Sequence, residues 1–210
     1  MNPIRINRAT LSELVWNKLP YIHRPLGYQF EELERLRSQA DYNTGSISDT
    51  DAIDLQHIVS HFQPMVVAEV GTFIGRSTAA MALAMPKGGV IHTCDASNAI
   101  ALPELNPDVQ VVQYPCKGST EMFESLISAK AKVDLFYIDG RLSPKDTRLV
   151  WELAHDKTVI VLDDFEGVEK GVANAMLLLQ QFPNHALVYP RDIGKTAMML
   201  PSGLLQFTAQ

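Results

Sequence analysis

The chain has 210 residues, of which 46% are hydrophobic and 20% charged, values ordinary for a globular protein with one sizeable core. The formal net charge of -6 argues against a general nucleic-acid binder, because phosphate backbones are held by clustered Lys and Arg. No run of about 18 apolar residues appears, so no membrane span is expected, and the first residues lack the apolar core of a secretion signal. Together these features favour a cytoplasmic protein with no nucleic-acid or membrane partner.

The two cysteines, Cys94 and Cys116, are too few for a disulfide framework. Both lie in or beside predicted strands, so we expect reduced, partly buried thiols. Reduced thiols of this kind also fit the cytoplasm.

The first 47 residues differ in character from the rest of the chain. They contain several prolines and glycines, followed by a charged stretch over residues 30–39 with helical character. We expect residues 1–47 to form a helical extension, either a lid over the substrate site or a segment that packs on the surface of the domain. Residues 48–210 are expected to form the ligand-binding domain, beginning with a helix over 48–62 that Ser48 can cap.

From Met65 onward, short apolar and β-branched runs alternate with helical segments. Each run is too short for a helix and too apolar for an edge strand, which is typical of parallel strands buried on both faces. The predicted strands are 65–70, 89–94, 109–113, 133–138 and 158–162. The predicted helices after that of 48–62 are 76–85, 119–130, 143–154 and 167–180. This alternation predicts right-handed crossovers and a Rossmann-like, doubly wound α/β sheet.

The end of the chain breaks the alternation. The apolar runs 186–190 and 196–200 are separated by only about five residues, too few for a crossover helix. They therefore predict an antiparallel hairpin. The fold class is α/β, with a mostly parallel seven-stranded sheet that closes in this C-terminal hairpin.

A glycine-containing loop, from Glu69 to Ser77, leaves the first predicted strand and enters a helix. Ligands of open α/β sheets bind outside the carboxyl ends of the strands, so a cofactor is expected here. Gly71 permits a tight turn and Gly75 a close backbone approach. The free N–H groups of the helix N-terminus, helped by the Ser77 hydroxyl, would favour an anionic group.

The spacing of the two glycines in this loop argues against two known nucleotide-binding motifs. Gly71 and Gly75 are separated by three residues, which does not fit the dinucleotide fingerprint. A P-loop has four residues between its glycines and then a Lys, which does not fit either. Glu69 would repel a polyphosphate and suits a cofactor that carries an ammonium group. Asp95, about twenty residues beyond the loop, can accept hydrogen bonds from both ribose hydroxyls, although a capping or solvated Asp is the simpler alternative.

At these residues the chain resembles the class I S-adenosylmethionine-dependent methyltransferases. The segment EVGTFIGRSTAAMALA is similar to the first motif of the catechol and caffeoyl-CoA O-methyltransferase group and its small bacterial relatives. The resemblance covers residues 44–200 and implies S-adenosylmethionine as cofactor. It places Glu69 near the methionine ammonium, Ser77 on the carboxylate and Asp95 on the ribose.

The resemblance also implies contacts beyond the glycine loop. The segment over 44–47 resembles one that closes over the methionine end, and Gly118, Ser119 and Thr120 fall where the group contacts adenine. The full set of cofactor-binding residues that it implies is Ile47, Glu69, Gly71, Thr72, Phe73, Gly75, Ser77, Asp95, Ala96, Gly118, Ser119, Thr120, Asp139 and Gly140.

Three aspartates follow the fourth and fifth predicted strands: Asp139, Asp163 and Asp164. Neighbouring ends of parallel strands bring them to one rim, where three carboxylates and waters suit Mg²⁺. The resemblance implies that this ion binds a substrate hydroxyl, lowers its pKa and orients its oxygen toward the methyl group, with Asp139 catalytic. Without a metal, Asp139 could line the cofactor site and Asp163 could cap a helix or bind substrate. The related group carries Asp-Asn where this chain carries Asp163-Asp164.

One departure from the related group concerns the general base. The group often carries a Lys three residues after the first Asp, and this chain has Leu142 there. Arg141 cannot act as a base at ordinary pH, and Lys145 is expected to be solvated at the start of a capped helix. The base is therefore unassigned, or the metal alone generates the alkoxide.

Two expectations concern burial rather than chemistry. Trp151 and the methionines of 198–199 are expected in the core. His57 and His61 are four residues apart on one helix, and no third ligand lies near them, so an exposed face is expected.

The sequence thus predicts an S-adenosylmethionine-dependent methyltransferase that transfers a methyl group to a small-molecule hydroxyl with Mg²⁺ assistance. A metal-independent methyltransferase of another acceptor, with Asp139 or a His as base, stays open. So does a non-catalytic S-adenosylmethionine-binding module, and a nucleotide-phosphate enzyme is a more remote option. Acceptor specificity has no readable code in the loops. Many proteins of the related group form dimers, which leaves a homodimer open.

Overall fold

The computed structural model describes residues 46–97, 102, 105–165, 170–190 and 195–205. The expected helical extension over 1–47 lies outside these residues except for Ser46 and Ile47. The lid and the surface segment that we expect of it therefore both stay predictions.

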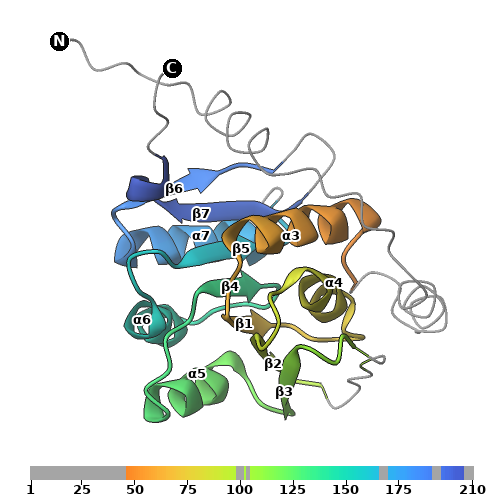
Figure 1. Ribbon diagram of the computed structural model, residues 1–210. Helices are drawn as coiled ribbons and strands as arrows, with labels where there is room; N and C mark the ends of the chain where they lie inside the picture. The colour runs from red at the N-terminus through yellow and green to blue at the C-terminus, as the bar shows by residue number, and fades with distance from the viewer. Residues whose placement is uncertain (1–45, 98–101, 103–104, 166–169, 191–194, 206–210) are drawn as a thin grey trace, which may run out of the picture.

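The described chain forms a seven-stranded sheet in the order β3-β2-β1-β4-β5-β7-β6 (Figure 1). Strands β1 to β5 run parallel to one another, and β7 is antiparallel to both of its neighbours, β5 and β6. The strands are β1 (Val66–Val70), β2 (Val90–Asp95), β3 (Gln110–Pro115), β4 (Leu135–Ile138), β5 (Val159–Leu162), β6 (His185–Val188) and β7 (Ala197–Pro201). The predicted Rossmann-like sheet with an antiparallel C-terminal hairpin is confirmed.

The strand order reverses between β1 and β4. The chain moves outward from β1 through β2 to β3 and then returns to place β4 on the other side of β1. Such a reversal opens a crevice at the carboxyl ends of the two central strands, because the connections that follow them run in opposite directions. The predicted site residues follow these strands.

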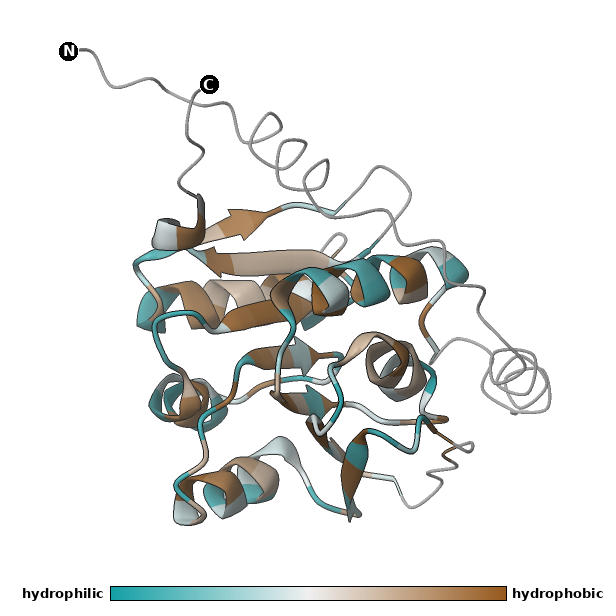
Figure 2. Ribbon diagram, in the orientation of Figure 1, coloured by the Kyte–Doolittle hydropathy of each residue, from teal (hydrophilic) through white to brown (hydrophobic). Residues whose placement is uncertain are grey.

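Helices cover both faces of the sheet (Figure 1). One face carries α3 (Asp49–Phe62) and α4 (Arg76–Ala84), and the other carries α5 (Ser119–Ser128), α6 (Pro144–Leu153) and α7 (Lys170–Gln181). A short 3₁₀ helix, η1 (Ser202–Leu205), follows β7. Figure 2 shows hydrophobic residues concentrated on the strands, whereas the helices alternate hydrophobic and hydrophilic residues, as expected of elements that bury one side. Within the described ranges, no helix has the length and apolar character to cross a membrane.

The helix starts follow the predicted capping chemistry. The Ser48 hydroxyl accepts a hydrogen bond from the Asp51 N–H at the start of α3. At α6, Ser143 and Asp146 form a reciprocal capping box, and Pro144 occupies the first helical position.

Four expectations on burial were wrong. Strand β3 is an edge strand with an exposed outer side, and the polar Gln110 and Gln113 within it are exposed. Cys116 is exposed, although Cys94 is buried as expected. Trp151 is 53% exposed and His57 only 1% exposed, the reverse of what we expected for each. The aromatic ring of Trp151 packs against one neighbour, Phe182, at the end of a helix rather than under the sheet.

Candidate functional site

The candidate site lies at the carboxyl edge of the central strands. The glycine loop follows β1, Asp95 ends β2, Asp139 and Gly140 follow β4, and the Asp163-Asp164 pair follows β5. These segments are far apart in the sequence and meet because β1, β2, β4 and β5 run parallel and in register.

Gly71 is the point of closest approach between two of these segments. Its φ is +101°, and its N–H donates to the Cys94 carbonyl at 2.9 Å. A Cβ on Gly71 would lie 3.2 Å from the Asp139 carbonyl carbon, so a larger residue would push β1 and β4 apart at the site. Gly75, with φ +75°, starts α4, and a Cβ there would meet the side chain of Leu102 at 2.2 Å. Both glycines are therefore required for the backbone path of the loop.

Glu69 lies beneath the loop rather than in it. Its carboxylate is fully buried and receives hydrogen bonds from the hydroxyls of Ser77 and Thr78, each at 2.5 Å. Burial raises the pKa of Glu69 to about 7, although the hydroxyl donors oppose the shift. In this structure Glu69 and Ser77 bind each other, so their predicted roles toward the methionine ammonium and carboxylate stay predictions.

Asp95 fixes the shape of the glycine loop. One carboxylate oxygen accepts the Phe73 N–H at 2.8 Å, and the other accepts the Ser97 N–H at 2.8 Å. Phe73 has a left-handed φ of 44°, a conformation that this bond helps to hold. Ala96, between Asp95 and Ser97, is exposed. Thr72 lies at the same turn, where its hydroxyl is 2.5 Å from that of Thr93.

The predicted adenine-contacting residues lie at the start of α5. Gly118 is its N-cap, and Ser119 is buried. The Thr120 hydroxyl donates to Asp146 at 2.5 Å, the carboxylate that also completes the capping box of α6. Thr120 therefore ties α5 to α6 in addition to any contact with a ligand.

A small hollow lies between the glycine loop, Ile47 and Asp139. The buried Arg76 guanidinium donates to the Ile47 carbonyl at 2.9 Å and pairs with Asp49, which holds this segment against the start of α4. The hollow encloses only about 10 Å³. Pockets that hold drug-sized ligands measure about 300 to 1,000 Å³, so the hollow in this structure is far smaller than a pocket for such a ligand.

The three predicted aspartates do come together. Carboxylate oxygens of Asp139, Asp163 and Asp164 all lie within 4.8 Å of one another. Asp163 is 5% exposed, and its Oδ1 has no hydrogen-bond partner. Burial raises the pKa of both Asp139 and Asp163, and each neighbouring carboxylate raises the pKa of Asp163 further. Asp164 adopts a left-handed φ of 49°, a conformation that Asp tolerates better than most residues.

Sequence reasoning missed the cation that binds this cluster. Lys170, the first residue of α7, places its Nζ 2.6 Å from Asp139 Oδ1 and 2.9 Å from Asp164 Oδ2. Burial lowers the pKa of Lys170, but the two carboxylates outweigh it and raise the pKa above its ordinary value. Lys145 is the lysine that follows Asp139 in the sequence, but it forms an exposed ion pair with Glu124 and does not contact the cluster. The only signal for Lys170 was its place shortly after the Asp163-Asp164 pair.

Helix α7 reaches the site through two further residues. A Cβ on Gly171 would lie 2.1 Å from the Asp163 carbonyl oxygen, so only glycine allows the helix to start against this pair. The Asn174 amide donates to the Gly140 carbonyl at 2.7 Å and accepts the Leu142 N–H at 3.0 Å. These bonds fix the turn that follows Asp139. On the other side of this turn, a Cβ on Gly140 would lie 2.7 Å from the Val70 side chain.

The chemistry of the cluster fits a hard divalent cation in part. The three carboxylates are suitable ligands for Mg²⁺, and one of them, that of Asp163, has a buried oxygen without a hydrogen-bond partner. The ammonium of Lys170, however, contacts two of the three carboxylates. The three aspartates can therefore bind such an ion only if the Lys170 side chain moves away.

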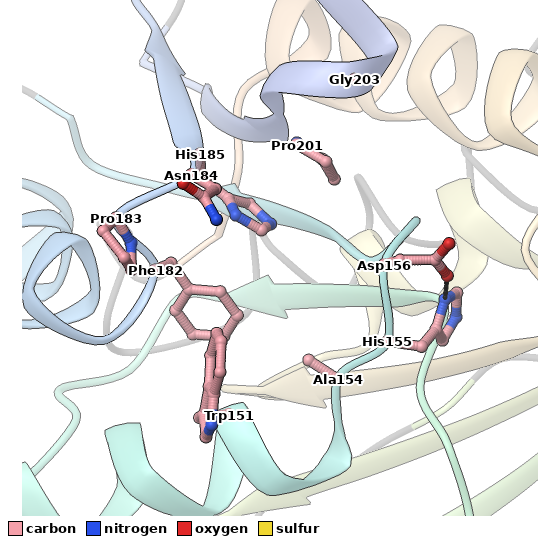
Figure 3. A pocket seen from close by; sticks show the side chains of 10 residues that line it. All are labelled: Trp151, Ala154, His155, Asp156, Phe182, Pro183, Asn184, His185, Pro201 and Gly203. Atoms are coloured by element: carbon pink, nitrogen blue, oxygen red, sulfur yellow. Dashed lines mark ion pairs between the residues drawn. The ribbon is translucent and has the colours of Figure 1, made fainter.

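A larger cavity, of about 590 Å³, lies where β5 and β6 begin and β7 ends, away from the candidate site (Figure 3). Its lining includes Trp151, Phe182 and His185, whose rings form edge-to-face contacts with centroids 5.0 and 4.9 Å apart. His155, also at its border, binds Asp134 at 2.9 Å. None of the predicted site residues lines this cavity, so its size alone does not make it the candidate site.

The sheet order, the β1 loop and the antiparallel β7 define the class I methyltransferase fold. Comparison with known proteins supports this assignment. Residues 68–165, slightly less than half of the chain, match the family model of a methyltransferase domain. No curated protein matches the sequence.

Solved structures resemble nearly the whole chain. An O-methyltransferase from Bacillus cereus, in complex with S-adenosylhomocysteine, is 18% identical with a TM-score of 0.67, covering 89% of this chain and 97% of that one. A putative O-methyltransferase from Klebsiella pneumoniae is 17% identical with a TM-score of 0.65, covering 90% and 96%. TomG from Streptomyces achromogenes, an O-methyltransferase involved in tomaymycin synthesis and bound to S-adenosylmethionine, is 14% identical with a TM-score of 0.63, covering 90% and 94%. At these identities the likeness establishes the fold, and it is the class I methyltransferase fold that the sequence predicted.

Proposed function

We propose that this chain transfers a methyl group from S-adenosylmethionine to the hydroxyl of a small molecule. One observation carries the proposal. The glycine loop and a cluster of three carboxylates lie at the same edge of the sheet, joined where Gly71 approaches Asp139. The cofactor would bind on one side of this junction and the acceptor on the other.

The loop side supplies the groups that a methionine-bearing nucleoside needs. Asp95 would accept hydrogen bonds from the ribose hydroxyls, and the N-terminus of α4 would bind the methionine carboxylate. Glu69 would favour the ammonium through its charge, while Ser77 and Thr78 keep its carboxylate in place. Ile47, anchored by Arg76, would close over the methionine end.

The carboxylate side would hold the acceptor. A hydroxyl bound beside Asp139 lies at the junction with the cofactor, and its proton would pass to a carboxylate of the cluster as the oxygen attacks. S-adenosylmethionine supplies the methyl group, whose bond to sulfur breaks as the bond to oxygen forms. The positively charged sulfonium becomes the neutral thioether of S-adenosylhomocysteine, which then leaves, so the charge lost at sulfur is balanced by the proton that the carboxylate has accepted.

We further propose that Asp139, Asp163 and Asp164 hold Mg²⁺ during the reaction. This ion would lower the pKa of the acceptor hydroxyl and orient its oxygen. The buried, unbonded oxygen of Asp163 supports the assignment, because such a group lacks any other partner.

A metal-independent methyltransferase is the second candidate, and Lys170 is the observation that favours it. Its ammonium already neutralises Asp139 and Asp164 in part. In that case Asp139 alone would accept the proton of the acceptor.

Isothermal titration calorimetry with S-adenosylhomocysteine, with and without Mg²⁺, tests the proposal. We expect binding with a dissociation constant on the order of micromolar, weakened by Asp95→Ala. Turnover is then measured as S-adenosylhomocysteine release with a panel of small hydroxyl compounds. Asp139→Asn is expected to retain S-adenosylhomocysteine binding and lose turnover. No binding by the wild-type protein under either condition would overturn the proposal. Binding without turnover on any acceptor would favour a non-catalytic binding module.

A further inference from the structure

The acidic cluster brings carboxylates of like charge together, and Lys170 places a positive charge against two of them. Three carboxylates lie within 4.8 Å of one another, and Asp163 is nearly inaccessible to water. Like charges at this distance repel strongly when water is excluded. Lys170 is the cation that contacts the cluster in the described residues, and it spans Asp139 and Asp164, which come from different strand ends.

We propose that Lys170 is a built-in counter-cation of this cluster, which holds Asp139 and Asp164 together until a divalent cation displaces it. The inference rests on the proposed function only in treating the cluster as the place where the ion binds. Lys170, the first residue of α7, would thus control the affinity for the metal ion, a role that is separate from the transfer of the methyl group.

The geometry allows this displacement without disturbing the fold. The start of α7 is fixed by the contact of Gly171 with the Asp163 carbonyl and by the two hydrogen bonds of Asn174. The Lys170 side chain is 25% exposed, so its four-carbon stem has access to solvent. Its ammonium can therefore swing outward while its backbone stays in the helix.

A divalent cation gains more from the cluster than Lys170 does. Lys170 contacts two carboxylates, whereas the third, Asp163, keeps an unbonded buried oxygen. A hard divalent ion carries twice the charge and binds oxygen ligands from all three residues. Binding of the ion must still release Lys170, which lowers the net affinity for the ion.

The test is a Mn²⁺ titration by calorimetry, in parallel with the melting temperature with and without Mn²⁺. The Lys170→Met variant keeps the side-chain length and removes the charge. We expect it to bind Mn²⁺ about tenfold tighter than the wild type, because no cation has to leave. We also expect it to melt at a lower temperature than the wild type without metal, and Mn²⁺ to restore the loss.

Two further variants sharpen the test. Lys145→Met removes a more exposed lysine, which pairs with Glu124 away from the cluster, and should leave Mn²⁺ affinity unchanged. Lys170→Arg keeps the charge in a group that binds carboxylates with two parallel bonds, so it should weaken Mn²⁺ binding relative to the wild type. The predicted order of affinity is Met, then Lys, then Arg at position 170. A purely structural role of Lys170 would not produce this order, and Lys170→Arg keeps the test available should Lys170→Met fold poorly.

Equal or weaker Mn²⁺ binding by Lys170→Met, or no Mn²⁺ binding by any of the proteins, would overturn the inference. S-adenosylhomocysteine binding is measured on the same samples. If it is retained while the Mn²⁺ order fails, the proposed methyltransferase function stands and only the role of Lys170 is rejected. If the wild type binds Mn²⁺ but not S-adenosylhomocysteine, the proposed function fails instead.

Discussion

Glu69 is a buried acid whose protonation depends on the fold. Burial raises its pKa from an ordinary value of 4.5 to about 7, against the effect of its hydroxyl partners. Between these two pH values the folded protein binds a proton that the unfolded chain has released. The unfolding free energy is therefore expected to fall as pH rises from about 4.5 to about 7, because the native state binds more protons there.

The Glu69→Gln variant tests this linkage. Glutamine can keep hydrogen bonds to Ser77 and Thr78 but has no proton to lose. We expect the wild type to lose stability relative to the variant between pH 4.5 and pH 7, by on the order of 3 kcal/mol. Urea unfolding at several pH values measures the difference. Both proteins contain Asp139 and Asp163, so the comparison separates the titration of Glu69 from that of these two residues. Parallel curves of unfolding free energy against pH would show that Glu69 does not titrate in this window.

Tyr137 carries a buried hydroxyl that makes no hydrogen bond. The residue is 1% exposed and belongs to the hydrophobic core, and its hydroxyl has no hydrogen-bond partner. We expect Tyr137→Phe to leave the unfolding free energy unchanged or to raise it by about 1 kcal/mol, since an unpaired polar group is removed.

Thr158→Val is the matched comparison for Tyr137→Phe. The Thr158 hydroxyl is equally buried but donates to the Val133 carbonyl and accepts the His155 N–H. Its removal should cost about 1 to 3 kcal/mol in chemical denaturation. A loss of this size in Tyr137→Phe would mean that its hydroxyl has a partner after all.

At the scale of single elements, α7 does most to assemble the site, and Gly171 permits its position. In an ordinary helix, Gly→Ala stabilises by about 0.5 to 1 kcal/mol. Here the added methyl would lie 2.1 Å from the Asp163 carbonyl oxygen. We expect Gly171→Ala to lower the unfolding free energy by about 1 to 3 kcal/mol and to weaken Mn²⁺ binding.

Gly203→Ala, in η1, is the control for the Gly171→Ala substitution. A Cβ at Gly203 meets nothing within 4 Å, so this variant should change stability by less than about 0.5 kcal/mol. Both variants are compared by thermal unfolding. Equal melting temperatures for the two would contradict the role of Gly171 as a required point of contact.

The elements themselves were largely readable from the sequence. The apolar runs of β1, β2, β4 and β5 and the Ser143 capping box have local signals, and the structure follows them. The three aspartates could be grouped because each ends a parallel strand. Strand β3 was mistaken for an interior strand, since its exposed glutamines were given too little weight.

What the sequence could not provide were contacts made across elements. Lys170 follows the Asp163-Asp164 pair by a few residues, yet its partner Asp139 ends another strand, and no local pattern joins them. Asn174 is similar, because its bonds go to the turn after β4. The exposure of Trp151 and the burial of His57 depend on how the helices pack, which amino-acid type alone does not determine.

At the scale of the whole molecule, the two thiols report on the fold in different ways. Cys116 is exposed, whereas Cys94 is 1% exposed and burial raises its pKa to about 12. We expect one thiol per chain to react at once with a disulfide reagent and the second to react only as fast as the molecule opens. Rapid reaction of both thiols would contradict the buried position of β2.

Ligand binding should slow the second thiol further. The Cys94 carbonyl accepts the Gly71 N–H, so the thiol belongs to the strand that supports the glycine loop. A ligand that binds only the closed molecule stabilises it by RT ln(1 + c/Kd), where c is the free ligand concentration, so the open fraction falls as this concentration rises above the dissociation constant. Slower labelling of Cys94 with S-adenosylhomocysteine, without any change at Cys116, would provide an independent measure of its binding.

The placement of β7 between β5 and β6 has a consequence for biosynthesis. During translation, β5 emerges from the ribosome well before residues 197–201, yet its second neighbour is β7. Until then the nascent chain exposes an unpaired, apolar strand edge beside the future site, and β6 has no strand with which to pair. The sheet is therefore completed by the strand that is synthesised after the other six, since β7 pairs with β5 on one side and with β6 on the other. A chaperone that binds extended apolar chain would be needed most in that interval.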